Sequence, residues 1–380
     1  MSTRLLLIIP TLDRNGAEKQ LTLLACGLPR PEFDVEVCCL TRGGPLAEDL
    51  RAAGVPVTII GKRWKLDPFA FRRLQAHIRH TAPDIVHTWL FAANSYGRLA
   101  AQRAGVPTII AGERCVDPWK RWHELAIDRW LTRYTRRVLT NSTGVRDFYA
   151  GHGISSQLFS VIPNGISLPV LPEPQRLAEQ RHQLLRELQL PAHARLIGTV
   201  GRLWPQKRQR DLIWAADLLK CVHDDTYLLI VGDGPLRWRL ERYTRQIQIT
   251  DRVLFLGERQ DVPRIMPHLS CFWLGSEYEG QSNALMEAMS WGIPCVATDI
   301  PGNRDLVIPA QTGYLVPVGD RAELARKTER ILENQNWAAQ LGAAGRARME
   351  REFSVEQMVA RHAELYRSLS PTVHGIEARD

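Results

Sequence analysis

The segment from Ser276 to Glu287 holds the densest group of side chains that could do chemistry. It reads SEYEGQSNALME, so Glu279 and Glu287 bracket a small polar loop. An apolar run at 271–274 predicts a strand before this loop, and residues 284–291 have helical spacing. Amide groups at the start of such a helix attract an anion, because their donors and the helix dipole point toward it. The small polar loop before the helix consists of Gly280, Gln281, Ser282 and Asn283.

The two carboxylates suit hydroxyl groups on either side of a bound phosphate. In the alternative interpretation Glu279 is only an N-terminal capping carboxylate and Glu287 is a solvated helix residue. The residue types alone do not decide between the two.

A second loop, from Gly201 to Lys207, carries two cations after a predicted strand. Arg202 offers a planar fork and Lys207 a mobile point charge, so together they suit a diphosphate. A solvated basic turn is the alternative. Near the start of the chain, Asn15-Gly16 lets the backbone approach a ligand without a Cβ, although such pairs are also common in ordinary turns.

The elements that must position these loops alternate between strand-like and helical runs. Strands are expected at 5–9, 35–40, 57–60, 84–89, 108–111 and 137–141, and again at 195–201, 227–231, 253–257, 271–274 and 294–298. This order predicts an α/β fold with two doubly wound parallel sheets, that is, two Rossmann-like domains. Because parallel sheets bind ligands beyond the carboxyl ends of their strands, we expect the chemistry in strand-to-helix loops facing a cleft.

The proline-dense stretch LPVLPEP at 168–174 suits a semi-rigid connection between the domains. We therefore expect an N-terminal domain at 1–165 and a C-terminal domain at 166–352. A chain of 380 residues is long enough for two cores.

The composition of the chain limits which class of protein it can be and which kinds of partner it can bind. No run reaches the roughly 20 apolar residues that cross a bilayer, so we expect a cytoplasmic protein without a signal peptide. The seven cysteines are scattered and lack CxxC spacing, which favours neither a disulfide framework nor a zinc cage. Residues 1–165 hold 22 Lys and Arg against 14 Asp and Glu, whereas the remainder holds 27 of each. The basic first half favours anionic partners.

Several short motifs occur together in one order. They are VIPNG at 161–165, the pair Arg202 and Lys207, VGDGP at 231–235, the pair Glu279 and Glu287, PGNRD at 301–305 and TGYLV at 312–316. In this set the chain resembles the family 4 (group 1) retaining glycosyltransferases of the GT-B fold. The resemblance runs from Pro10 to about Tyr366 and is densest in the second half.

The resemblance implies a role for each matching residue. Arg202 and Lys207 would bind the diphosphate of a nucleotide-sugar, Glu287 the ribose, and Glu279 the donor sugar. The amides of Gly280, Gln281, Ser282 and Asn283 would meet phosphate or sugar, and Gly16 would approach the diphosphate from the other domain. The acceptor would bind to the N-terminal domain and the donor to the C-terminal domain, with a C-terminal helix within 353–380 returning to the first domain.

The family mechanism implies retention at the anomeric carbon, with the leaving phosphate helping to deprotonate the acceptor hydroxyl. The donor substrate is expected to be a UDP-sugar, with no separate cofactor. The sequence contains no DxD triplet and no His/Asp cluster at metal-ligand spacing, so we expect a metal-independent reaction in which the two cations serve instead of a divalent ion.

One position departs from the family pattern. Many relatives carry a histidine after the strand that corresponds to 108–111, whereas this sequence reads Gly112-Glu113-Arg114. Glu113 or Arg114 is expected to take that place, with His87 as another polar group facing the cleft, so Glu113 and His87 join the catalytic candidates. In the alternatives, His87 is a structural histidine, and Glu113 and Arg114 pair with each other.

Two patches in the basic first half interleave aromatic residues with cations. They lie at 62–73 and at 119–137. Such patches suit an anionic membrane surface, so we expect peripheral association with the inner face of the membrane. Solvated helix faces with the aromatic rings turned inward are the alternative. No motif supports nucleic-acid binding.

The predicted function is transfer of a sugar from a nucleoside-diphosphate sugar to a hydroxyl acceptor in a polysaccharide or a lipid-linked glycan. A GT-B nucleotide-sugar epimerase and a non-catalytic nucleotide-binding module remain alternatives. A nicotinamide-dependent dehydrogenase is disfavoured, because Gly232-Asp233-Gly234 lacks the third glycine of that fingerprint.

Overall fold

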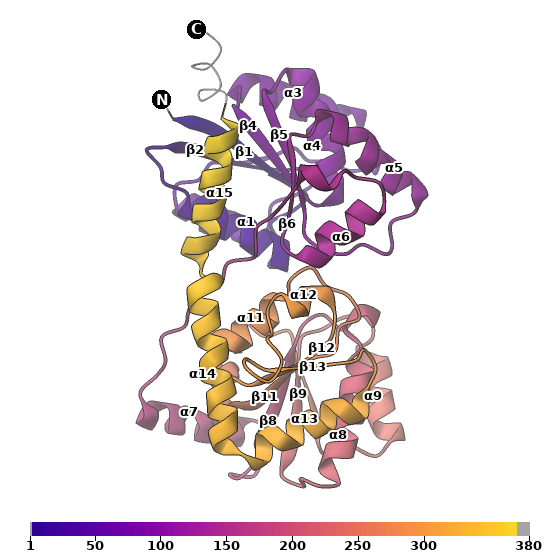
Figure 1. The fold of residues 1–380 in the computed structure, drawn as a ribbon, viewed down its shortest axis with the longest axis vertical. Helices are drawn as coiled ribbons and strands as arrows, with labels where there is room; N and C mark the ends of the chain where they lie inside the picture. The colour runs from indigo at the N-terminus through magenta and orange to yellow at the C-terminus, as the bar shows by residue number, and fades with distance from the viewer. Residues whose placement is uncertain (1, 371–380) are drawn as a thin grey trace. The chain divides into compact units, whose positions relative to one another are not determined.

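The computed structural model describes residues 2–370, which form two compact units (Figure 1). The first unit contains residues 2–165 and 355–370, and the second contains 166–354. The chain passes from the first unit to the second after Gly165 and returns after Ser354. Sequence analysis placed these passages after 165 and 352.

The first unit is a seven-stranded parallel sheet with helices on both faces. The sheet order is β3-β2-β1-β4-β5-β6-β7. Its elements are β1 (Thr3–Ile9), α1 (Gly16–Gly27), β2 (Phe33–Cys39), α2 (Leu46–Ala52), β3 (Val57–Ile59), α3 (Pro68–Thr81), β4 (Ile85–Trp89), α4 (Leu90–Ala104), β5 (Thr108–Glu113), α5 (Trp122–Leu131), β6 (Arg137–Thr140), α6 (Thr143–Gly151), β7 (Phe159–Val161) and α15 (Val355–Leu369).

The second unit is a six-stranded parallel sheet in the order β10-β9-β8-β11-β12-β13. Its elements are α7 (Pro174–Glu187), β8 (Arg195–Val200), α8 (Gln209–Lys220), β9 (Thr226–Val231), α9 (Arg237–Gln246), β10 (Val253–Gly257), α10 (Val262–Ile265), β11 (Leu269–Leu274), α11 (Asn283–Ser290), β12 (Cys295–Thr298), α12 (Pro301–Arg304), β13 (Tyr314–Val316), α13 (Arg321–Glu333) and α14 (Gln335–Glu352).

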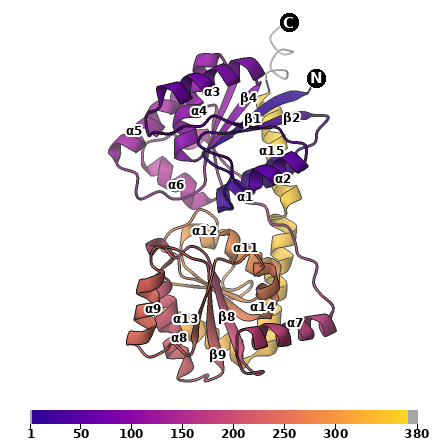
Figure 2. The same cartoon turned by 180° about the vertical axis from the view of Figure 1, so that it is seen from behind.

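Strands buried on both faces explain why the sequence shows apolar runs and not alternation. All six residues of β9 are buried, as are the last five residues of β1. In the first unit, α1 and α15 cover one face of the sheet and α3 and α4 cover the other (Figure 2). The predicted α/β class with two parallel sheets is confirmed.

Two strands were not predicted, β7 and β13. Each has three residues and lies at an edge of its sheet. A three-residue strand is too short to show a periodic pattern. The equally short β3 was predicted because its residues directly follow Pro56, whereas β7 and β13 are identified by their pairing with a neighbouring strand.

Helix α15 belongs to the core of the first unit although it ends the described chain. The Thr108 side chain donates to the Leu369 carbonyl at 2.9 Å, and Arg367 pairs with Glu32 at 2.5 Å. Sequence analysis expected this return helix within 353–380, and the part from 371 to 380 lies outside the described residues.

Candidate functional site

The loop that follows β8 is built on close backbone contact with the next strand. At Gly232 the backbone φ is +129°, and a Cβ there would lie 2.1 Å from the Gly201 carbonyl oxygen. Only glycine allows the ends of β8 and β9 to touch in this way. The chain then forms a short 3₁₀ turn at Pro205–Lys207, in which the Lys207 amide donates to the Trp204 carbonyl at 3.0 Å.

Lys207 forms an ion pair with Glu279 through Nζ and Oε1. Glu279 lies in the loop after β11, the strand that pairs with β8. Two further bonds join these loops: Gln206 Nε2 donates to the Tyr278 carbonyl at 2.6 Å, and the Glu277 amide donates to the Gln206 carbonyl at 2.9 Å. The structure thus brings together two predicted site residues from separate loops.

Helix α11 begins directly after this loop, one residue earlier than predicted. The Ser282 hydroxyl caps it by accepting from the Leu285 amide at 3.4 Å. At Gly302 a Cβ would lie 1.8 Å from the Gly280 carbonyl oxygen, so the start of α12 packs directly on the loop backbone. The loop before α11 is therefore held from both sides.

The predicted residues of this segment differ in exposure. Glu279 and Glu287 are half-buried, and Glu287 lies on α11 itself. The loop residues that are buried are Gly280, Gln281 and Ser282, and Asn283 is half-buried. The site is therefore partly enclosed before any ligand is considered.

Arg202 lies apart from the ion pair on the same loop as Lys207. Its side chain is exposed, and its guanidinium lies 5.4 Å from the centre of the Trp204 ring. Its carbonyl accepts from Gln209 Nε2 at 2.9 Å. The structure therefore fixes the backbone at Arg202 and leaves the guanidinium accessible.

In the first unit, Gly16 is the first residue of α1. Its neighbour Glu18 is 5% exposed and accepts from Thr11 at 3.5 Å and from Asn15 at 3.4 Å. Burial raises the pKa of Glu18. Sequence analysis did not select Glu18, although its place three residues after the N-terminal cap Asn15 is a readable signal.

Glu113 ends β5 and is 3% exposed. One carboxylate oxygen accepts from Asn94 Nδ2 at 2.9 Å, and the other accepts from the Tyr149 hydroxyl at 3.1 Å. Burial raises the pKa of Glu113 to about 7, with Lys120 opposing that rise. Arg114 is also buried, but it donates to Asn164, so the two neighbours do not pair with each other.

A buried network of charges surrounds Glu113, and sequence analysis missed it. Lys120 Nζ lies 2.8 Å from Asp128 and 3.5 Å from Glu113, and Asp128 also accepts from Arg98 at 2.8 Å. No local spacing marks these residues, because they come from α4, α5 and the loop between β5 and α5.

His87 lies inside β4 with 0% exposure. Its Nδ1 is 2.7 Å from the Tyr366 hydroxyl on α15, and burial lowers its pKa well below the usual range. These surroundings favour the structural alternative, and a catalytic role for His87 remains a prediction without support from its position.

One group of side chains in the described residues has the spacing of a metal site: His223, Glu329 and Glu333. Arg195 donates to His223 Nδ1 at 2.9 Å, so in neutral His223 the proton is on Nε2. A protonated Nε2 cannot ligate a cation, and Arg195 adds a positive charge beside the group. This geometry disfavours a metal ion there.

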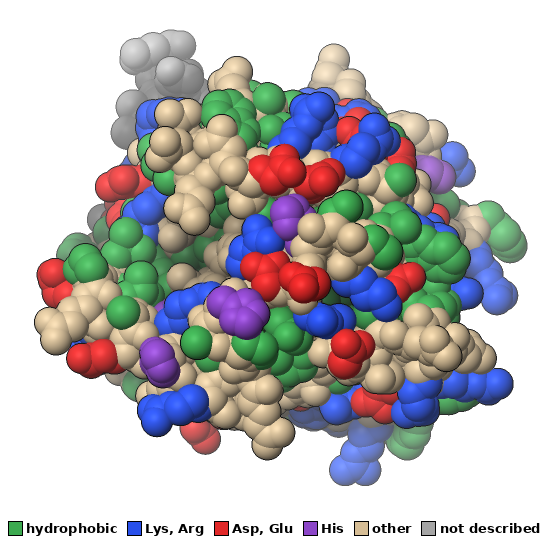
Figure 3. All heavy atoms as spheres, turned by 90° about the horizontal axis from the view of Figure 1, so that it is seen from below, with side chains coloured by type: hydrophobic (Ala, Val, Ile, Leu, Met, Phe, Trp, Pro, Cys, Tyr) green, Lys and Arg blue, Asp and Glu red, His purple; other side chains and the backbone are tan. Residues whose placement is uncertain are grey.

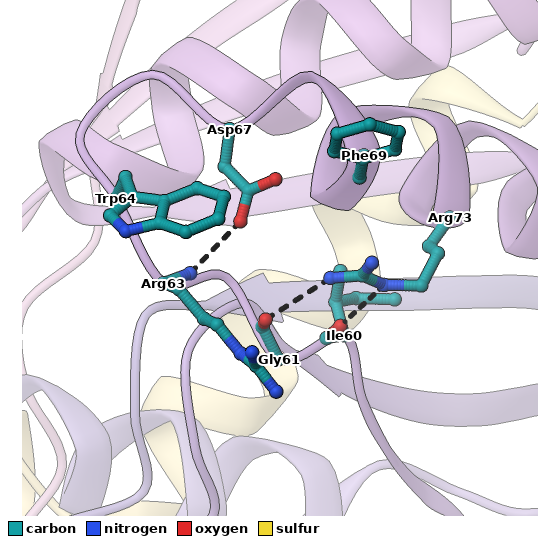
Figure 4. A pocket seen from close by; sticks show the side chains of 7 residues that line it. All are labelled: Ile60, Gly61, Arg63, Trp64, Asp67, Phe69 and Arg73. Carbon is teal, nitrogen blue, oxygen red and sulfur yellow. Dashed lines mark hydrogen bonds between the residues drawn. The ribbon is translucent and has the colours of Figure 1, made fainter.

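The two patches that interleave aromatic residues with cations, at 62–73 and 119–137, expose several of their aromatic rings to solvent. In the first patch Trp64 is 60% exposed and Phe69 is 62% exposed. They border an open pocket of about 440 Å³ (Figure 4). The Asp67 carboxylate fixes the loop beside this pocket, because it accepts hydrogen bonds from the Arg63 and Ala70 amides. In the second patch the exposed rings are Trp119, Trp122 and Trp130. The alternative interpretation, in which the aromatic rings turn inward, does not hold for these five side chains.

No helix within residues 2–370 is long and apolar enough to span a bilayer. On the face drawn in Figure 3, acidic and basic side chains lie next to each other, so positive charge is not segregated there.

Two family models together match most of the chain. Residues 14–169 match the model described as Glycosyltransferase Family 4, and residues 180–348 match the one described as Glycosyl transferases group 1. These ranges correspond closely to the two structural units.

Curated relatives carry glycosyltransferase names. The chain is 28% identical over 329 residues to the UDP-Gal:alpha-D-GlcNAc-diphosphoundecaprenol alpha-1,3-galactosyltransferase of Escherichia coli, covering 81% of this chain and 82% of that one. It is 30% identical over 262 residues to a GDP-mannose-dependent alpha-mannosyltransferase of Mycobacterium tuberculosis, covering 66% and 64%.

Among solved structures, HepE of Anabaena in complex with UDP-glucose superposes with a TM-score of 0.82 at 23% identity, over 96% of this chain and 99% of that one. At this identity the likeness concerns the fold. The chain belongs to the group 1, family 4 glycosyltransferases, and its two parallel-sheet units are those of the GT-B fold.

Proposed function

We propose that this glycosyltransferase moves a sugar from a UDP-sugar to a hydroxyl of a polysaccharide or a lipid-linked glycan, with retention at the anomeric carbon. The second unit binds the donor and the first unit binds the acceptor. The main support for assigning donor binding to the second unit is the ion pair between Lys207 and Glu279 beside the start of α11. It places a cation, a carboxylate and helix-start amides in one small volume.

Donor binding exchanges the partners of this ion pair. The diphosphate competes for Lys207, and the released Glu279 carboxylate then accepts hydrogen bonds from sugar hydroxyls. Arg202, whose guanidinium is exposed, closes on the diphosphate. Glu287 holds the ribose. Negative charge grows on the diphosphate as it leaves, so these fixed donors stabilise the transition state more than the ground state.

No divalent cation is required in this proposal, because Lys207 and Arg202 supply the positive charge. EDTA is expected to leave the rate unchanged. A loss of activity in EDTA that Mg²⁺ restores would contradict this part of the proposal.

Two observations support the proposed class of acceptor. The Escherichia coli relative is named for an acceptor linked to diphosphoundecaprenol. The first unit exposes tryptophans among lysines and arginines, a combination that suits the interfacial region of an anionic membrane. We propose that the enzyme works as a peripheral protein at the inner face of the membrane.

Thermal unfolding with nucleotides tests the donor assignment. UDP and one of its sugars should raise the melting temperature, since a ligand at 100 times its Kd stabilises by about 2.7 kcal/mol. GDP and GDP-mannose serve as comparison ligands. The rise should be lost in Arg202→Gln, and the absence of any rise with nucleoside diphosphates defeats the proposal.

Donor turnover that needs no acceptor would favour the epimerase.

A further inference from the structure

Arg114 is a buried cation without a carboxylate partner. It is 6% exposed, and its guanidinium lies over the Trp89 ring, 4.4 Å from the ring centre. Its Nη2 donates to Asn164 Oδ1, but Nε and Nη1 have no hydrogen-bond partner. Within residues 2–370 no Asp or Glu forms an ion pair with it. A buried charge in this state is costly unless something neutralises it.

Other unpaired polar atoms gather around Arg114. Of the fifteen buried side-chain atoms without a partner in the described residues, six belong to this cluster. They are Arg114 Nε and Nη1, Trp89 Nε1, Asn141 Oδ1, His87 Nε2 and His362 Nε2. Such a concentration points to a ligand, because buried polar groups in proteins are almost always satisfied.

The charge of the cluster selects the class of ligand. Burial lowers the pKa of His362 to about 3 and that of His87 well below its usual range, so both rings are neutral. Burial lowers the pKa of Arg114 only to about 9, so it keeps its charge near neutral pH. Water can satisfy hydrogen bonds but cannot neutralise this charge. An anion can do both.

The cluster lies where parallel sheets bind ligands. Trp89 ends β4, Arg114 directly follows β5, and Asn141 directly follows β6. Asn164 comes soon after β7, and these four strands are neighbours in the sheet. The carboxyl ends of four adjacent strands thus each contribute one residue.

We propose that Arg114, Trp89 and Asn141 form a binding site for a phosphate or carboxylate group in the first unit. Arg114 Nε and Nη1 and Trp89 Nε1 donate to the anion, and Asn141 Oδ1 accepts from a hydroxyl on it. If the proposed function holds, the anionic group belongs to the acceptor. That last assignment rests on the proposed function, whereas anion binding does not.

The experiment titrates inorganic phosphate into a full-length Arg202→Gln/Lys207→Met background, in which the proposed donor cations are removed. Phosphate should raise the melting temperature in this background. Adding Arg114→Met should weaken phosphate binding more than tenfold. Adding Arg51→Met, which removes an exposed arginine of the same unit, should change nothing.

Stability without anion separates a binding role from a structural one. In phosphate-free buffer Arg114→Met should be at least as stable as its parent, because the unpaired buried charge is gone. A lower melting temperature there, or a phosphate effect that survives Arg114→Met, overturns the proposal. So do crystals soaked in tungstate that show no anomalous peak beside Arg114.

A second arm identifies the source of the anion. A sugar 1-phosphate that binds at least tenfold more tightly than inorganic phosphate assigns the site to the acceptor, and equal affinities assign it to the free ion. Either result supports the site itself. Failure of UDP-sugars to stabilise the wild type would defeat the proposed function and leave the phosphate result standing.

Discussion

At the scale of single residues, the proposed donor site contains a cation and a carboxylate that are already paired with each other. Lys207 and Glu279 satisfy each other, and both are mostly buried. A lysine without this partner would carry an uncompensated charge in a partly buried loop. The pairing therefore keeps both side chains in place, and in the proposed function a diphosphate competes with Glu279 for the ammonium group.

Lys207→Met should reduce kcat/KM about 10²–10³-fold, because one donor aimed at developing charge contributes that much. Steady-state kinetics with saturating acceptor measures it. Lys220→Met, which removes a lysine from the surface of the same unit, is the matched control. Equal effects of the two substitutions would remove Lys207 from the site.

Glu113 should make stability depend on pH. Its folded pKa is about 7, above the ordinary value of 4.5, so the folded state binds this proton more tightly than the unfolded state. The stability that the protonated Glu113 side chain contributes is fully present below its pKa in the unfolded chain. It is lost as the pH rises through the folded pKa of about 7.

Glu113→Gln keeps the shape and cannot ionise, so the wild type should lose stability relative to this variant between about pH 5 and 8. Urea unfolding at several pH values measures the difference. Glu350→Gln, an exposed glutamate, should show no such trend. A difference that stays constant with pH would mean that Glu113 does not titrate in this range.

At the scale of elements, the loops of the proposed donor site are positioned by backbone contacts that only glycine permits. The start of α12 touches the loop before α11 at Gly302, and β9 touches the end of β8 at Gly232. These contacts join neighbouring loops at the carboxyl ends of the strands in the second sheet. Backbone packing therefore holds these neighbouring loops against each other.

Gly302→Ala should displace the loop before α11, since its Cβ would lie 1.8 Å from the Gly280 carbonyl oxygen. We expect a loss of about 1–3 kcal/mol of stability together with weaker UDP binding. Thermal unfolding and calorimetry measure the two effects. Gly151→Ala is the control, because a Cβ there meets nothing within 4 Å. Unchanged UDP affinity would show that this contact does not shape the site.

At the scale of the whole molecule, the excess positive charge lies in the first unit, which also exposes aromatic rings among its cations. The segment 62–81 of the first unit carries six lysines and arginines and one carboxylate, Asp67. Asp67 is buried and caps the N-terminus of α3. Trp64 and Phe69 stand exposed in the same segment. An anionic membrane complements both features.

Flotation with vesicles of phosphatidylglycerol and phosphatidylcholine should recover the protein, and less of it as salt increases. Trp64→Ser with Phe69→Ser should lower the bound fraction severalfold. Trp238→Ser, which removes an exposed ring of the second unit, should not. No flotation at low salt would defeat the membrane proposal.

The sequence by itself determined the α/β class, the positions of most strands along the chain and the loops that carry Arg202, Lys207, Glu279 and Glu287. These features are local: apolar runs, turn residues and short motifs are all readable within about ten positions. The same holds for the start of α11, which was placed within one residue.

Only the tertiary structure decided which of these residues meet and which buried groups lack a partner. Lys207 and Glu279 are 72 positions apart, and they pair because β8 and β11 are neighbours in the sheet. His87 reads as a strand-end histidine, but α15 buries it from more than 270 positions away. Arg114 was expected to take the place of a family histidine or to pair with Glu113, and only the packing shows that it is enclosed without a carboxylate. Burial and long-range pairing depend on how distant segments pack, and no local pattern encodes that.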